Sequence, residues 1–116
     1  MDNIKNLAYG TLAAGVDATQ LELQLASGLG SRFPAAPFNF IVYPASAGSA
    51  ALARPSNESG GKAAIYRCLI NDGDVLTCQG DGSGNRLGQE GTPAIAHNDT
   101  GETYIVKQIV SKIIFD

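Results

Sequence analysis

One histidine and two cysteines are the side chains best suited to nucleophilic or acid–base chemistry in this chain of 116 residues: His97, Cys68 and Cys78. A general base needs a nucleophile or an acid within hydrogen-bonding reach. Ser83 and Asp99 are available, but they stand in no recognised arrangement with His97. The sequence therefore predicts no catalytic centre, and we expect the protein not to be an enzyme.

Carboxylates cluster beside glycines at two places, in residues 72–74 and 81–85. Both segments could offer oxygen ligands to Ca²⁺, but neither fits the twelve-residue EF-hand pattern. Turn chemistry explains them more simply, because Asp, Asn and Gly favour tight turns. Glu90 could act as one of a catalytic pair of carboxylates with Asp81 or Asp99, but its simpler role is to accept backbone N–H bonds in the corner. We predict no metal and no cofactor.

The two cysteines lie on either side of the turn of a predicted hairpin, in which residues 62–70 and 75–79 surround an Asp-Gly turn. A three-residue loop would place Cys68 and Cys78 opposite each other, whereas a loop of two or four residues would place them on opposite faces. A cross-strand disulfide is geometrically awkward even in the first case. A zinc site would need two further ligands, and His97 is distant in sequence. Reduced, partly buried thiols are therefore predicted.

The elements that would position these groups are strands. Residues 19–25 alternate Leu with Gln and Glu, so that Leu21, Leu23 and Leu25 share one face. Residues 38–43 and 103–110 are further strand candidates. These patterns predict a single all-β domain over residues 1–116, a small sandwich or barrel of six to eight strands. We expect an N-terminal arm at 1–12, a long loop at 44–62 and a C-terminal tail at 111–116.

Charge and hydropathy exclude several partners. The net charge is −3 without a basic patch, so no nucleic-acid binding is expected. No apolar stretch approaches the roughly 18 residues of a membrane span. The first residues lack the apolar core of a secretory signal, so we expect none. In the tail, Ile113, Ile114 and Phe115 are too apolar to stay in water, and we expect them to pair within the sheet or dock on another chain.

A sharp corner is predicted after Gln89, because Gly91 can adopt positive φ and Pro93 fixes its own φ. The stretch Arg86-x-x-Gln-Glu-Gly-Thr-x-Ala-x-x-His97, followed by Gly101, resembles a signature of small virion structural proteins of tailed bacteriophages. A second matching block lies near the N-terminus, at residues 10–15, 21–23 and 28–39. The resemblance covers the N-terminal modules of tail fibres and short tail or neck proteins.

This resemblance implies a non-enzymatic structural protein located in the virion, with a tail, neck or baseplate attachment role. A capsid decoration (cement) protein, sitting as trimers on the shell, is the close alternative, and a glycan- or host-surface-binding module is the third. The implied partners are other virion proteins and further copies of this chain. The residues we expect in the assembly or structural motif are Arg32, Phe33, Pro34, Phe38, Gln89, Glu90, Gly91, Thr92, His97, Ile113, Ile114 and Phe115. For Phe33 and Phe38 we favour closure of one end of the core over an exposed partner surface.

Overall fold

The computed structural model describes residues 8–47, 63–89 and 92–109. This part of the chain holds six strands and two short 3-10 helices, and it contains no α-helix. It therefore contains no helix long and apolar enough to cross a membrane. The elements are β1 (Tyr9–Thr11), β2 (Glu22–Gln24), η1 (Leu29–Arg32), β3 (Phe38–Pro44), η2 (Ala45–Ala47), β4 (Ala64–Asp72), β5 (Val75–Cys78) and β6 (Tyr104–Ile109).

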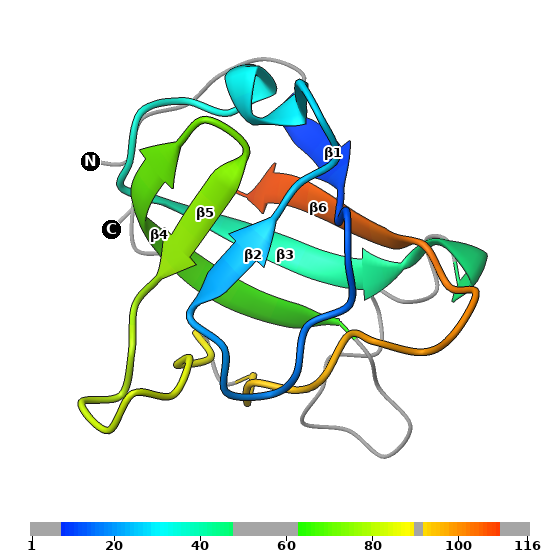
Figure 1. Cartoon of the computed structure of the whole chain (residues 1–116). Coiled ribbons are helices and arrows are strands. Elements are labelled where there is room, and N and C mark those ends of the chain that lie inside the picture. Colours follow the sequence, from blue (N-terminus) through cyan, green and yellow to red (C-terminus); the bar gives the residue numbers. More distant parts are fainter. Residues whose placement is uncertain (1–7, 48–62, 90–91, 110–116) are drawn as a thin grey trace.

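All six strands belong to one antiparallel sheet in the order β1-β6-β3-β4-β5-β2. The sheet curls into a half-barrel, with β2 in front of β3 in Figure 1. Its two outer strands meet at a bridge between Leu12 and Leu25. There Ala13 N donates to Gln24 O at 2.8 Å, and Ala26 N donates to Thr11 O at 2.9 Å. The all-β prediction is confirmed, and one curled sheet replaces the alternative of a two-sheet sandwich.

The inner face of the half-barrel is the core. The alternation predicted in residues 19–25 is confirmed for Leu23 and Leu25, which are fully buried, whereas Leu21 is only half-buried. Phe38, Phe40 and Val42 point inward from β3, as predicted. The other large inward side chains are Tyr66, Cys68, Leu76, Cys78, Tyr104 and Val106. On the outward face of the central strand β3, Asn39 and Ile41 are buried too.

The hairpin of β4 and β5 has a feature that the sequence did not predict. Asp72 pairs with Val75, so the turn contains only Gly73 and Asp74, and Gly73 has a φ of 62°. A two-residue loop should place the cysteines on opposite faces, and that expectation is wrong. A β-bulge between Cys68 and Ile70 adds one residue to β4, which brings Cys68 opposite Cys78 in the ladder.

The three predicted extended segments have different outcomes. Within the predicted N-terminal arm at 1–12, Tyr9–Thr11 pair with β6 as strand β1. Leu12 follows this strand and forms the bridge that joins the two edges of the sheet. In the predicted loop at 44–62, Pro44 ends β3 and residues 45–47 form η2. Residues 48–62 and the predicted tail at 111–116 lie outside the described residues.

Candidate functional site

A buried arginine occupies one end of the half-barrel. Arg86 is only 2% exposed, and its guanidinium donates to the carbonyl oxygens of Asp17 (2.8 Å), Gln20 and Ile95 (2.8 Å). Its Cζ lies 4.5 Å from the centre of the Tyr66 ring. Guanidinium groups suit this place because they donate several hydrogen bonds in one plane and stack on aromatic faces. Arg86 thereby joins the 17–20 turn, the 92–97 segment and β4.

Tyr66 and His97 complete this polar cluster. The Tyr66 hydroxyl lies 3.0 Å from His97 Nε2 and 3.4 Å from Arg86 Nη2. Burial raises the pKa of Tyr66, and the nearby Arg86 charge opposes that effect. The His97 backbone pairs with Val16 through N–H···O bonds of 2.8 and 3.1 Å. His97 is fully buried, and its contacts hold chain segments together.

The predicted corner is docked against β4. Gln89 N donates to Ile65 O at 2.7 Å, and Thr92 Oγ1 accepts from Ile65 N at 2.9 Å. Thr92 N donates to Gln89 O at 3.0 Å, which closes the corner as a tight turn. The glycine that the geometry requires is Gly88, because a Cβ there would collide with the Thr92 carbonyl oxygen. Glu90 and Gly91, where the sequence placed the sharp turn, lie outside the described residues.

The N-terminal motif residues also pack internally. Phe33 is 4% exposed and Phe38 is fully buried, and their rings stack with centroids 5.8 Å apart. Pro34 is buried as well, and its carbonyl accepts from Asn71 Nδ2 at 2.8 Å. The favoured interpretation, in which Phe33 and Phe38 close one end of the core, is therefore confirmed. Only Arg32 of this group is exposed.

The turn carboxylates act locally. Asp74 accepts from Gly28 N at 3.0 Å and from Gly30 N at 2.9 Å, so it holds the start of η1, and these bonds lower its pKa. Asp81 accepts from Ser83 N at 2.8 Å within the glycine-rich turn, which lowers the pKa of Asp81. Among the described residues, no group of three or more His, Cys, Asp or Glu side chains could hold a metal ion.

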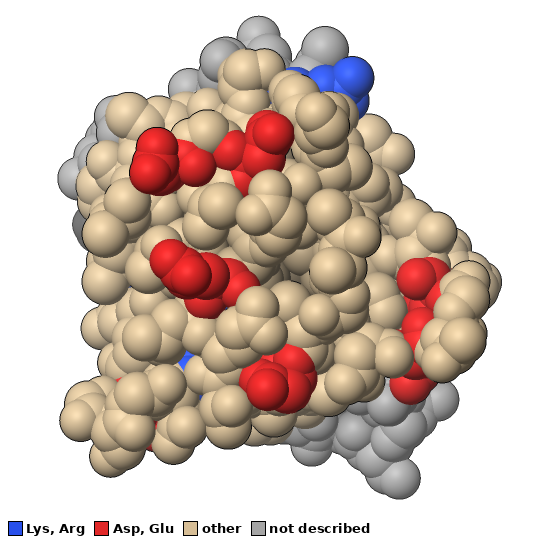
Figure 2. Space-filling model, in the orientation of Figure 1, with Lys and Arg blue, Asp and Glu red and all other residues tan. Residues whose placement is uncertain are grey.

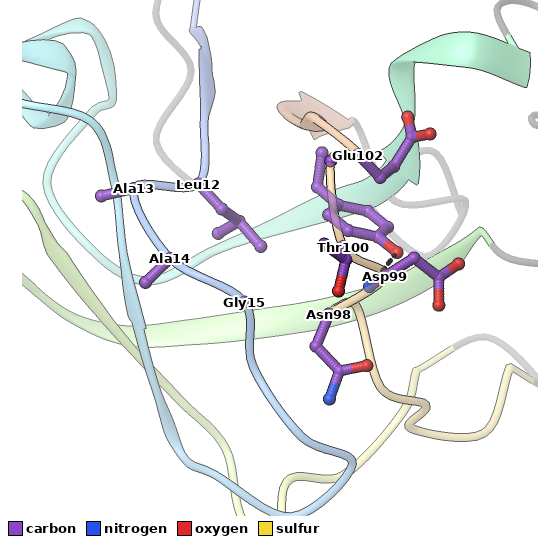
Figure 3. A pocket seen from close by; sticks show the side chains of 10 residues that line it. Leu12, Ala13, Ala14, Gly15, Asn98, Asp99, Thr100 and Glu102 are labelled. Atoms are coloured by element: carbon purple, nitrogen blue, oxygen red, sulfur yellow. Dashed lines mark hydrogen bonds between the residues drawn. The ribbon is translucent and has the colours of Figure 1, made fainter.

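A cleft of about 270 Å³ lies between the segment after β1 and the loop before β6. Figure 3 shows residues 12–15 on one side and residues 98–102 on the other. Asp99 N donates to the Tyr104 hydroxyl at 3.1 Å, and the Glu102 carboxylate accepts from Ser46 N (3.1 Å) and Ser46 Oγ (2.8 Å). Those bonds lower the pKa of Glu102. The carboxylates of Asp99 and Glu102 do not converge on one point, so the cleft offers no built ligand site.

The cysteines are poor nucleophiles. Cys68 and Cys78 are both buried free thiols. Burial raises the pKa of Cys68 to about 11 and the pKa of Cys78 to about 12. Because the thiolate is the reactive form, neither thiol is activated at neutral pH.

Sequence reasoning missed the role of Arg86 as the centre of the buried cluster. A lone arginine beside a glycine-rich turn gives no periodic signal, and its acceptors come from segments far away in the chain. It also missed two exposed aliphatic side chains on β4, Leu69 and Ile70. The bulge that turns them outward has no characteristic residue pattern, so the sequence does not predict it. Ile113, Ile114 and Phe115 lie outside the described residues.

No protein-family model matches this chain, and a search of curated proteins gives no match either.

Proposed function

We propose that this chain is a non-enzymatic structural protein of a tailed-phage virion, with an attachment role in the tail, neck or baseplate. The proposal comes from the resemblance of residues 86–101 and of the N-terminal block. The structural observation that supports the proposal is the set of contacts that the signature residues make. Arg86, Gln89, Thr92 and His97 all bind other parts of the fold. Signature residues that stabilise the fold are what we expect in a module that functions in assembly.

The described chemistry is compatible with this role. His97 is inaccessible, and both thiols are protonated at neutral pH. The carboxylates of Asp74 and Glu102 accept hydrogen bonds that stabilise turns. In such a protein the outer surface carries the function, and we propose that it acts through contacts with other virion proteins and further copies of itself.

Capsid decoration is the second candidate. The observation that favours it is the localised apolar exposure on β4, at Leu69 and Ile70. A subunit that coats a shell needs only one attachment surface, and a small patch on one β domain could supply it. This candidate keeps the same protein class and differs only in virion location.

Localisation in purified particles tests both candidates. Cryo-electron microscopy or immunogold labelling should place the protein at the tail or its vertex, with particles from a deletion phage as the control. Labelling spread over the icosahedral shell would replace the tail role with the decoration role. If the protein is missing from every particle, the structural proposal is wrong.

A further inference from the structure

We propose that Leu69 and Ile70 form the centre of a docking surface for another virion protein, one that presents an apolar recess edged by lysine or arginine. We call this surface the β4 patch, and we define it as Leu69, Ile70, Val75, Glu22 and Asp72. The inference rests on the proposed function, because it names the chemistry of the partner.

The two aliphatic side chains at its centre are unusually exposed. Leu69 is 48% exposed and Ile70 is 57% exposed, the highest values among the large hydrophobic residues of the described chain. The other two such residues, Tyr9 and Leu87, stand apart from each other in sequence. Single exposed apolar residues are ordinary, whereas adjacent ones on one face suggest an interaction site.

The β-bulge explains how two consecutive residues of one strand can both be exposed. Side chains of a regular strand alternate between the two faces. The extra residue in β4 breaks that alternation between Cys68, which is buried, and Ile70. Bulges commonly re-aim side chains near functional surfaces. The core thus keeps Cys68 while both aliphatic residues remain at the surface.

The register defines what surrounds them. Ile70 pairs with Thr77, which pairs with Glu22, so these three outward residues form one row across β4, β5 and β2. Asp72 and Val75 form the neighbouring row. Both carboxylate residues are exposed, and Val75 is half-buried. The apolar centre therefore has one carboxylate beside it on β4, Asp72, and a second beyond β5 on β2, Glu22.

The charge of this face selects the partner. Carboxylates are spread across the face seen in Figure 2, whereas the main basic group in view lies at its upper rim. On β4 itself, the Arg67 guanidinium turns to Asn39 on β3, to which Nη1 donates at 2.9 Å. A second copy docking through the same patch would bring like charges together, which is unfavourable. A different chain with basic residues around an apolar recess would match both the apolar centre and the negative charge of the β4 patch.

Complementation of a deletion phage tests this inference with the full chain. Cells supply either the wild type or the double variant L69Q/I70T, and the copies per purified particle are measured by quantitative mass spectrometry. Threonine keeps the β-branching that suits a strand. Tyr9→Thr is the matched control, because Tyr9 is 43% exposed and lies on β1. We expect at least tenfold fewer copies for the double variant and no change for the control.

The charge frame is tested by E22K/D72K, which should also lower the copy number at least tenfold. These surface substitutions decide the matter if L69Q/I70T unfolds. If folded double and charge variants are both incorporated like the wild type, the β4 patch is not the docking surface, although the virion role stands. If the wild type is absent from particles, the proposed function fails. If L69Q/I70T instead abolishes self-association in solution, the patch is a contact between copies and the inference is wrong.

Discussion

Replacing Arg86 with methionine should lower the free energy of unfolding by about 3 kcal/mol, since hydrogen bonds from a charged donor such as its guanidinium contribute more than ordinary ones. Methionine keeps much of the unbranched length of the side chain but removes every donor. In the wild type, the Arg86 guanidinium donates to three backbone carbonyls and stacks on Tyr66. The substitution therefore tests whether this one side chain holds the end of the half-barrel together.

The magnitude follows from opposing contributions. A buried carbonyl that loses its hydrogen bond costs about 1–3 kcal/mol. The carbonyl of the half-buried Ile95 would keep only the long 3.4 Å hydrogen bond from the Tyr66 hydroxyl. Asp17 and Gln20 are exposed, so their carbonyls can bind water instead. Loss of the cation–π contact costs about 1–2 kcal/mol. Removing a buried charge also relieves its desolvation cost, which keeps the net loss near 3 kcal/mol.

Urea and thermal unfolding give the measurement. With an unfolding entropy of about 2.1 cal/mol/K per residue, a loss of 3 kcal/mol lowers the Tm by roughly 12 °C for a chain of 116 residues. The Tm of Arg86→Lys should lie between those of the wild type and Arg86→Met, because an ammonium cannot stack and donate in one plane. Arg32→Met is the control, because Arg32 is exposed. If Arg86→Met and Arg32→Met lower the Tm equally, the stapling role of Arg86 is refuted.

Three further predictions concern other parts of the fold. Gly88→Ala should abolish soluble expression or lower the Tm by more than about 10 °C, because its Cβ would collide with the Thr92 carbonyl; an unchanged melting curve would contradict this. Asp74 has a lowered pKa in the folded state, so its contribution is present above its usual value of 3.8 and is lost as the pH falls through the lower folded value. Urea unfolding across the acid range should show this fall, and Asp74→Asn should make it shallower. Cys68 and Cys78 should not react with a thiol reagent at pH 8 in the native state, because a pKa of about 11 or higher leaves about one thiol in a thousand ionised; both should react in denaturant, and rapid native labelling would show that they are accessible.

The sequence by itself determined the fold class and most of the strands. Alternating residues in 19–25 and 38–43 identified β2 and β3, because a strand with one buried face must repeat every two residues. The Asp-Gly turn located the hairpin of β4 and β5, since glycine adopts the positive φ that Gly73 shows. These signals are local, and each lies within a few residues of the structure it specifies.

Only the tertiary structure decided how the sheet closes and which side chains are available. The Leu12–Leu25 bridge joins the two ends of the strand order, and a pairing of distant segments leaves no local pattern. Phe33 shows the consequence, because its burial depends on the ring of Phe38. Arg86 shows it more strongly. Its acceptors on Asp17, Gln20 and Ile95 are brought together by the curl of the sheet, and a buried charge is tolerable only where such acceptors converge.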